Sequence, residues 1–341
     1  MRKMRATIRQ VAERAGVSRT TVSNVLLGRQ DIVAPDKYDT VLQAARDLDY
    51  VPVRPTLQNR HIETRVIAVP FDEPRKIGWS INSGTYAGIC EQAMEHGYDV
   101  LMLLRADPDW AVNRSEVQFL DRRSDGIIFA SPIIGESEQT FEALARHNIP
   151  AVVCYRRDLP PEISWVDVDN RAAMRGAVEH LVKLGHRRIV HLSEKVNWSF
   201  DNQQRRRYFT EAMREFGQRE WAETMVEIPY FEANVQSVDE ILGMGATAAV
   251  AMNDLLALDL KQTIVGMGLS VPGDLSLIGV DGVNAQENDL TSMEFSFADI
   301  GRHATQALVA RLNGVAAQNC CREVPVTLAA RGSVKDLRQN S

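Results

Sequence analysis

The segment AGVSRTTVSNVLLG, residues 15–28, constrains the fold more than any other, because a Gly-Val-Ser turn separates two short stretches of helical spacing. With Ile8 aligned to the first position of a helix-turn-helix template, the helix crossing falls on Ala12 and the left-handed turn on Gly16. Ser18 then occupies the N-cap of the second helix, where its hydroxyl can accept from a backbone N–H. The segment is predicted to be a helix-turn-helix, since all apolar template positions are filled, by Val11, Ala15, Val17, Val22 and Val25.

A third helix is expected over residues 35–48, because Pro35 suits a first helical turn and an apolar stripe follows: Val41, Leu42, Ala45 and Leu48. It would close a three-helix unit. The outer face of the second helix would carry side chains that can enter a DNA major groove, namely Arg19, Thr20, Thr21 and Asn24. A helical bundle with no DNA role is the alternative, and the complete template favours DNA binding.

Charge is distributed unevenly along the chain, whose total is −6. Residues 1–65 hold twelve Lys or Arg and seven Asp or Glu, so this end carries +5 and the remainder carries −11. A basic end on an acidic body indicates that one end binds a polyanion while the body does not. Chance variation of surface charge is the alternative explanation.

From Thr64 onward the pattern changes to alternating strands and helices. Apolar runs typical of buried parallel strands occur at 65–71, 98–104, 126–131, 150–155, 187–193, 247–254 and 274–281. Helical patterns separate them, for example at 86–96 and 171–184. Because the alternation occurs twice, we expect two doubly wound α/β lobes.

Polar residues follow several of these expected strands directly. Parallel lobes bind ligands at the carboxyl ends of their strands, so these residues indicate a cleft that closes on a small polar molecule. Each residue alone could equally be an ordinary turn residue. The residues are Ser131, Tyr155, Arg156, Asn253, Asp254, Asp281 and Gly282.

Several classes of protein are disfavoured. No apolar stretch reaches the length of about 18 residues that a membrane helix needs, so no membrane partner is expected. The cysteines (Cys90, Cys154, Cys320 and Cys321) and the scattered histidines lack metal-ligand spacing, so neither a metal nor another cofactor is expected. No nucleophile-elbow sequence occurs, and the chain is predicted not to be an enzyme. A sugar-binding receptor with a dispensable N-terminal extension and an α/β hydrolase are the alternatives from other classes.

The run TIRQVAERAGVSRTTVSNVL, residues 7–26, and the run RDLDYVP, residues 46–52, resemble the LacI/GalR family of bacterial transcription repressors. The resemblance extends to about residue 334. It implies an all-α helix-turn-helix head joined to an α/β, periplasmic-binding-protein-like body of two doubly wound lobes. It also implies a homodimeric repressor in the bacterial cytoplasm, associated with the nucleoid, that binds a pseudo-palindromic double-stranded DNA operator. The C-terminus carries no leucine heptads, so no tetramer-forming tail is expected.

The domain boundaries expected from these patterns are a head at 1–52, a linker at 53–64, a body at 65–334 and a tail at 335–341. Within the body, the first lobe would comprise about 65–160 plus 291–320. The second lobe would comprise about 161–290 plus 321–334.

The resemblance assigns DNA contacts to Thr7, Ser18, Arg19, Thr20, Thr21, Ser23, Asn24, Arg29, Tyr50 and Leu57. The family often has Arg at the position of Asn24, and because Asn suits adenine whereas Arg suits guanine, a changed operator base is expected there. The linker also departs from the family, with Val53, Pro55 and Asn59 at altered positions. Either Leu57 wedges into the minor groove from a shifted register, or the segment is only a tether.

The resemblance likewise assigns a small-molecule effector site, in which carboxylate, guanidinium and aromatic groups suit a hydroxylated ligand. A sugar or sugar derivative is therefore expected, Arg156 would also permit an acidic group, and a nucleobase is the alternative. Tyr208 departs from the family, which usually has Gly there. The effector residues are Trp79, Asn82, Thr85, Ser131, Tyr155, Arg156, Arg205, Asn253, Asp281 and Phe295.

Overall fold

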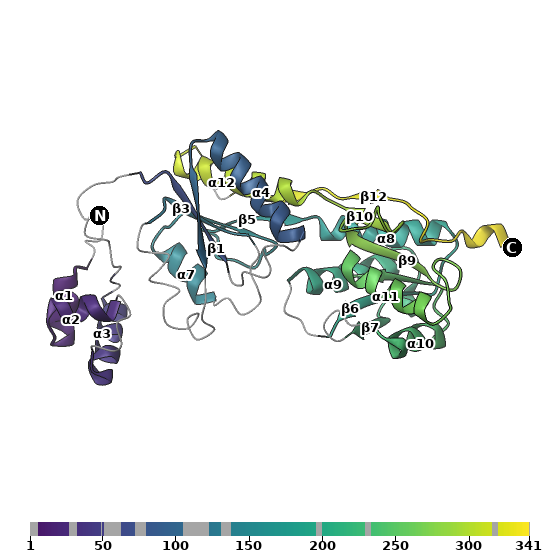
Figure 1. Ribbon diagram of the computed structural model, residues 1–341, viewed down its shortest axis with the longest axis horizontal. Helices are drawn as coiled ribbons and strands as arrows, with labels where there is room; N and C mark the ends of the chain where they lie inside the picture. The colour runs from purple at the N-terminus through teal and green to yellow at the C-terminus, as the bar shows by residue number, and fades with distance from the viewer. Residues whose placement is uncertain are drawn as a thin grey trace.

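The N-terminal head folds as three helices around a small apolar core in the computed structural model, which describes residues 6–26, 33–48, 50, 63–71, 80–104, 123–130, 138–195, 200–228, 233–315 and 320–340. The helices are α1 (Ile8–Ala15), α2 (Arg19–Leu26) and α3 (Pro35–Asp47) (Figure 1). The expected template is confirmed, since Gly16 has a φ of 64° and ends α1. The buried core residues are Val11, Ala12, Val22, Val25, Val41, Ala44 and Ala45.

The first lobe is built on a six-stranded sheet of order β11-β5-β4-β3-β1-β2, in which every pairing is parallel. Its strands are β1 (Val66–Phe71), β2 (Asp99–Leu104), β3 (Gly126–Phe129), β4 (Ala151–Cys154), β5 (Ser164–Val168) and β11 (Cys321–Val324). Alternate strand residues pack on opposite faces. Helices α4 (Ser80–Glu95) and α12 (Phe297–Leu312) cover one face, and α7 (Glu138–Arg146) covers the other.

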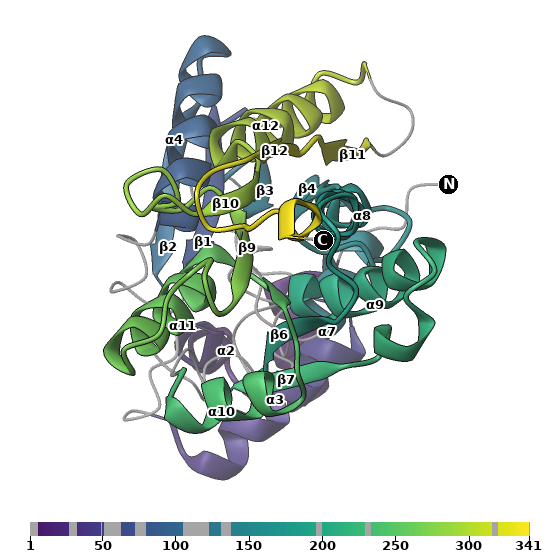
Figure 2. The ribbon, with the colours of Figure 1, turned by 90° about the vertical axis from the view of Figure 1, so that its right-hand side faces the viewer.

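The second lobe contains a six-stranded sheet of order β12-β10-β9-β8-β6-β7, parallel except for the β10–β12 pair. Its strands are β6 (Ile189–Glu194), β7 (Met225–Ile228), β8 (Ala248–Ala251), β9 (Ser276–Asp281), β10 (Thr291–Glu294) and β12 (Thr327–Ala329). Helices α8 (Asn170–Lys183) and α9 (Phe200–Glu215) pack on one face, and α10 (Val235–Gly243) and α11 (Asp254–Gly266) on the other (Figure 2). Short 3₁₀ helices, η4 (Arg219–Trp221) and η5 (Leu337–Asn340), complete the lobe. The expected class of two doubly wound α/β lobes is confirmed.

The chain crosses between the lobes later than the sequence indicated. Strand β5 pairs with β4 and β11 in the first sheet, and β10 pairs with β9 in the second, so three strands lie in the other lobe from the one expected. The reason is packing. Val166 and Val324 are buried in the core under α12, whereas Met293 is buried under α8 and α9. The chain therefore crosses to the other lobe after β5, β10 and β11, and not before each of these strands.

Helices α4 and α12 approach each other closely because glycines line their crossing. A Cβ on Gly88 would lie 2.0 Å from the carbonyl oxygen of Ala298, and one on Gly301 would lie 2.1 Å from that of Thr85. No larger residue fits without moving a backbone. The crossing fixes the position of Thr85, which is fully buried.

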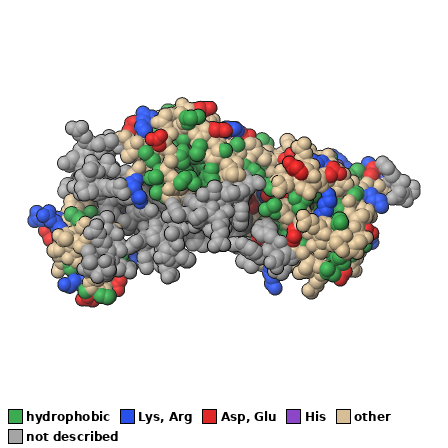
Figure 3. All heavy atoms as spheres, in the orientation of Figure 1, with side chains coloured by type: hydrophobic (Ala, Val, Ile, Leu, Met, Phe, Trp, Pro, Cys, Tyr) green, Lys and Arg blue, Asp and Glu red, His purple; other side chains and the backbone are tan. Residues whose placement is uncertain are grey.

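On the face that Figure 3 shows, hydrophobic side chains gather mainly on the first lobe, while charged side chains are spread over both lobes. No helix in the described part of the chain is both long and apolar enough to cross a lipid bilayer.

Candidate functional site

The outer face of α2 presents the polar side chains that the sequence assigned to DNA. Arg19 and Thr20 are exposed, and Asn24 is partly exposed. This orientation is fixed from behind, because Val22 and Val25 on the same helix are buried in the head core. Burial of one stripe leaves the opposite stripe free to meet a groove.

Five further residues of the expected DNA-binding set lie in the head, and all but Ser23 have a structural contact there. Thr7 caps α1 in a capping box with Gln10, and Ser18 Oγ accepts a hydrogen bond from the Thr21 N–H at 3.0 Å. Ser23 is partly exposed, and Tyr50 packs against the core, where burial raises the pKa of its phenol. The other two members of the set, Arg29 and Leu57, lie outside the described residues, as do Val53, Pro55 and Asn59 of the linker.

Two of the expected effector residues, Tyr155 and Asp281, lie where strands end, one in each lobe. Tyr155 follows β4 in the first lobe with a φ of 62°, and Asp281 ends β9 in the second lobe with a φ of 109°. Such left-handed backbone is strained for residues other than glycine and is concentrated at functional sites. The two side chains lie in the same region, since the Asp281 charge is one of the causes that raise the pKa of Tyr155.

Arg205 on α9 lies at the centre of the residues that the second lobe contributes to the candidate site. Its side chain is only 4% exposed, and Nη2 lies 3.0 Å from Asp281 Oδ1. Nε donates to Asn170 Oδ1 at 2.8 Å, and Nη1 donates to the Met252 carbonyl. Because Asn170, Met252 and Asp281 come from three different segments, Arg205 ties the start of α8 to the ends of β8 and β9.

The first-lobe wall contributes Thr85 and Tyr155, whose hydroxyls lie 2.7 Å apart in a buried hydrogen bond. Asn82, one turn earlier on α4, is also buried. Phe295 lies at the crossing that follows β10, where it packs against the cores of both lobes and contacts the Phe297 ring edge-on at 4.8 Å. These residues place hydroxyl, amide and aromatic groups close to where the lobes meet.

Arg156 is buried at the meeting of the lobes. Its guanidinium lies over the ring of Phe200 on α9 at 4.3 Å, and Nε donates to Asp158 at 2.9 Å. A second contact between the lobes joins Gln204 Nε2 to Asp167 Oδ2 at 3.2 Å. Arg156 thus has protein partners on both sides.

Asn253 is the N-cap of α11, where its Oδ1 accepts from the Leu256 N–H at 2.9 Å. The expected residues Trp79 and Ser131 lie outside the described residues. Tyr208, the departure from the family pattern, is buried against α8 and α9 without displacing Arg205.

The structure adds four polar residues that the expected effector set lacked: Asp167, Asn170, Asp201 and Asp254. Asn170 Nδ2 donates to Asp201 Oδ1 at 2.8 Å, so Asp201 joins the Arg205 network. A sequence signal for Asp201 existed, because it lies four residues before Arg205 and hence on the same face of α9. Asp254 directly follows Asn253, and the sequence had already indicated it as a polar residue after an expected strand.

Burial raises the pKa of three carboxyl groups in the candidate site, those of Asp201, Asp281 and Asp254. That of Asp201 rises to about 7, and that of Asp281 to about 6 although the Arg205 charge lowers it. Burial and the nearby Asp281 raise the pKa of Asp254 to about 8. Perturbed pKa values of this kind are concentrated at binding and catalytic sites.

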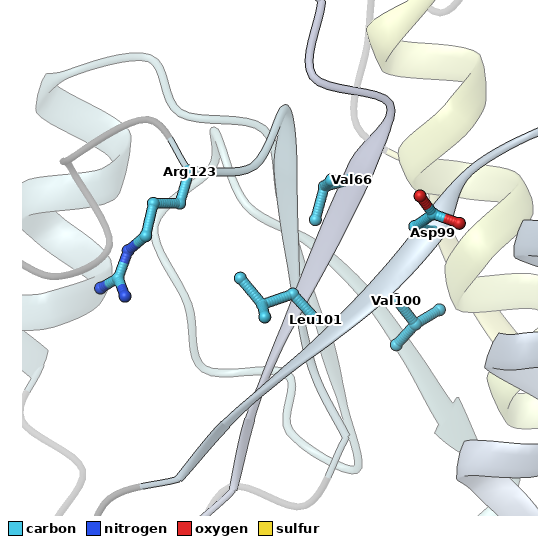
Figure 4. A pocket seen from close by; sticks show the side chains of 5 residues that line it. All are labelled: Val66, Asp99, Val100, Leu101 and Arg123. Carbon is cyan, nitrogen blue, oxygen red and sulfur yellow. The ribbon is translucent and has the colours of Figure 1, made fainter. Parts of the chain in front are cut away.

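The hollow drawn in Figure 4 is a different feature. It measures about 430 Å³ and lies at the amino ends of β1 and β2, where it is lined by Val66, Asp99, Val100, Leu101 and Arg123. It contains none of the expected site residues. With few convergent polar groups it offers no recognisable ligand site. Among the residues that the structure describes, no three His, Cys, Asp or Glu side chains gather as a set of metal ligands.

Comparison with known proteins matches two families along the chain. Residues 7–53 match the family described as bacterial regulatory proteins, lacI family, and residues 178–334 match a periplasmic binding protein-like domain. The HTH-type transcriptional repressor PurR of Mannheimia succiniciproducens is 28% identical over 342 residues, covering 97% of this chain and 99% of that protein.

Solved structures show the same fold. A transcriptional regulator CelR–cellobiose complex superposes with a TM-score of 0.70 at 24% identity, covering 96% of this chain and 100% of the other. The Lac repressor dimer bound to operator and an anti-inducer superposes with a TM-score of 0.67 at 24% identity, covering 97% and 100%.

Proposed function

The chain belongs to the LacI family of bacterial DNA-binding transcriptional regulators, and we propose that it is a repressor whose operator affinity is controlled by a small polar effector bound between its lobes. The single observation that carries this function is the pairing of two features in one chain. An outward polar face on α2 can read DNA, and a buried Arg205–Asp281 pair lies at the strand ends of the body.

Operator reading is proposed for Arg19, Thr20 and Asn24 on α2, because their side chains are the ones free to reach base edges. The asparagine side chain pairs bidentately with adenine, so the operator carries an adenine at the base pair that Asn24 faces. The head binds one half-site, and a homodimer binds two half-sites about one helical turn apart. The Lac repressor relative, described as a dimer on operator, supports this arrangement.

A sugar or sugar derivative is the proposed effector class. Asp281 supplies acceptors for hydroxyl groups, Thr85 and Tyr155 supply hydroxyls, and Phe295 supplies an aromatic face. The cellobiose bound by the CelR relative supports a carbohydrate. The predicted roles of Trp79, Asn82, Ser131, Arg156 and Asn253 remain part of this proposal.

Control of DNA binding follows from the connections between the lobes. Arg156 contacts Phe200 across the lobes, and Gln204 contacts Asp167. A ligand that moves one lobe against the other must therefore rearrange these two contacts. Thr64 and Arg65, which precede β1, donate backbone hydrogen bonds to Asp125, so the chain that enters the first lobe from the linker is held to that lobe. The effector shifts operator affinity only by the difference between its affinities for the two arrangements.

The proposed action is binding without catalysis, at operators of the nucleoid in the bacterial cytoplasm. The relatives compared are transcriptional regulators, which supports this proposal. Two experiments separate it from the alternatives. Removal of residues 1–60 abolishes specific DNA binding in a repressor but leaves a sugar receptor functional, and chromatography of the bound ligand after incubation detects any turnover.

A thermal-shift screen of sugars, sugar acids and purines tests the effector half of the proposal. A specific effector raises the melting temperature with its concentration because it binds only the folded protein. The same compound must change operator binding in a mobility-shift assay. A compound that stabilises the body at all concentrations without altering operator affinity contradicts control by that site.

A further inference from the structure

One carboxylate of the first lobe binds the chain where it enters the body. Asp125, in the bend before β3, accepts three hydrogen bonds from two consecutive residues. Thr64 donates to Oδ1 through its N–H at 2.8 Å and through its hydroxyl at 2.9 Å, and the Arg65 N–H donates to Oδ2 at 2.8 Å. Hydrogen bonds to an ionised acceptor are stronger than neutral ones. We call Thr64, Arg65 and Asp125 the linker joint.

Further contacts fix the direction in which the chain leaves the linker joint. Arg65 has a φ of 53°, a left-handed conformation that residues other than glycine rarely adopt. Its carbonyl accepts from the Asp99 N–H at 2.8 Å, and its guanidinium lies over the Tyr98 ring at 5.2 Å. The Asp125 N–H in turn donates to the Val66 carbonyl at 2.8 Å. The strained backbone is therefore held on both sides.

Asp125 is itself fixed to the first lobe. It precedes Gly126, the first residue of β3, which pairs with β1 and β4 inside the sheet. Leu308 of α12 packs so closely on Gly126 that a Cβ there would lie 2.7 Å from Leu308 Cδ1, and Leu308 is fully buried. The carboxylate therefore moves only with the first lobe, and the end of the linker moves with the carboxylate.

We propose that Asp125 is a positioning residue for operator recognition. By fixing Thr64 and Arg65 to the first lobe, it sets the spacing of the two half-sites that the dimer binds. The inference rests on the proposed function, since it concerns how the two heads of that repressor reach their half-sites. Asp125 acts through the chain that leads to the head, and the base contacts belong to α2.

The expected effect follows from the length of chain that the linker joint holds. Without Asp125, Thr64 and Arg65 join the linker and add up to about 7 Å of extended chain to each protomer. One base pair advances the duplex by about 3.4 Å. Each head then reaches about two base pairs further. A two-headed protein whose linkers cannot span both sites loses the contribution of its second head, which is worth about 100-fold or more in affinity.

The test compares operator spacings on the full-length protein. The duplex that the wild type selects is used with its original spacing and with two base pairs inserted at its centre, and fluorescence anisotropy gives both affinities. We expect the insertion to weaken the wild type about 100-fold and Asp125→Ala about tenfold or less. On the original duplex the two proteins should agree within about threefold, because lengthening a linker by two residues changes its effective concentration little.

The ratio of the two affinities separates positioning from stability. A protein that is merely less stable binds both duplexes less well and keeps the ratio, whereas a freed linker changes it. Base preference at the position that Asn24 faces should stay the same in Asp125→Ala, since the head is untouched. Thermal unfolding of each variant shows that it is folded under the assay conditions.

Two further variants complete the comparison. Asp99→Ala is the matched control, since it removes an exposed carboxylate at the same end of the sheet but keeps the N–H that donates to Arg65; it should keep the wild-type penalty. Thr64→Val removes the hydroxyl, keeps the two backbone bonds to Asp125, and should give an intermediate penalty.

Three results overturn the inference: a full penalty in Asp125→Ala, no penalty in the wild type, or a penalty in Asp99→Ala reduced as far as in Asp125→Ala. If Asp125→Ala does not fold, Thr64→Val decides, and an unchanged penalty in that variant overturns the inference as well.

Failure of this inference is separable from failure of the proposed function. A wild type that selects a specific duplex, together with an Asp125→Ala variant of unchanged spacing preference, leaves the repressor intact and removes the role of the linker joint. A wild type that selects no duplex removes the function, and the inference with it.

Discussion

The stability of the second lobe should depend on the protonation of Asp254. This carboxyl is fully buried at the first residue of α11, where Oδ1 accepts from Ser292 Oγ at 2.7 Å. Burial raises its pKa to about 8, above the ordinary aspartate value of about 3.9. Because the folded-state pKa is raised, protonation stabilises the fold, and that stabilisation is lost as the pH rises through 8.

The magnitude follows from the same shift. Stability is lost as the pH rises from the unfolded-state pKa of about 3.9 to the folded-state pKa of about 8. The two pH units between about pH 6 and about pH 8 therefore remove about 3 kcal/mol from the free energy of unfolding, and little more is lost up to about pH 9. Asp254→Asn is neutral at every pH and lacks this loss. Urea unfolding followed by circular dichroism, at about pH 6 and about pH 9, should therefore show the variant gaining about 3 kcal/mol on the wild type as the pH rises.

Comparison of the two proteins isolates Asp254 together with its charge coupling to Asp281, because every other titrating group is common to both. Asp239→Asn is the matched control, since Asp239 is exposed on the adjacent helix α10 and should follow the wild type. If wild type and Asp254→Asn lose stability in parallel from pH 6 to pH 9, the carboxyl is ionised throughout and the reasoning is refuted.

Three further substitutions probe the head, the site and the packing. Asn24→Ala should weaken the preferred operator by about 1–3 kcal/mol and relax base choice at one position, which binding-site selection measures; unchanged base preference contradicts the assignment. Arg205→Met should destabilise the body by about 3 kcal/mol in urea unfolding, because it leaves Asp281 buried without its cation, and an unchanged midpoint excludes that pairing. Gly301→Ala should cost about 2–3 kcal/mol at the α4–α12 crossing, whereas Gly266→Ala, with open space around its Cβ, should be neutral or stabilising by about 0.5–1 kcal/mol in thermal unfolding; similar effects of both refute the crossing argument.

Most of the architecture could be predicted because it rests on local patterns. The helix-turn-helix depends on small and apolar residues at fixed spacing, and the left-handed Gly16 occurs where the template requires it. The lobe crossings were misplaced because β5, β10 and β11 are short, and their sequence does not reveal which of two adjacent sheets will bury Val166, Met293 or Val324. Choice of sheet is a long-range packing property.

The assignment of the effector residues stays a prediction, and the structure shows which of them lie together. Strand-end position and family resemblance together indicated Arg205 and Asp281, which the structure joins in an ion pair. Asn170 and Asp201 were missed because their importance comes from the hydrogen bond between them, across 31 residues, and from the one between Asn170 and Arg205, across 35 residues. Such a network follows from the packing of α8 on α9, which sequence spacing alone does not specify.

Selection of preferred duplexes from a random pool by the full-length protein tests whether α2 reads a specific operator under control of the body. We expect recovery of a pseudo-palindrome with two half-sites about one helical turn apart, carrying an adenine at the base pair that faces Asn24. We further expect that a ligand which stabilises the body changes affinity for this sequence and leaves non-specific binding unchanged. Equal, salt-sensitive binding to every duplex, with no palindrome enriched under any ligand, would contradict specific reading by α2.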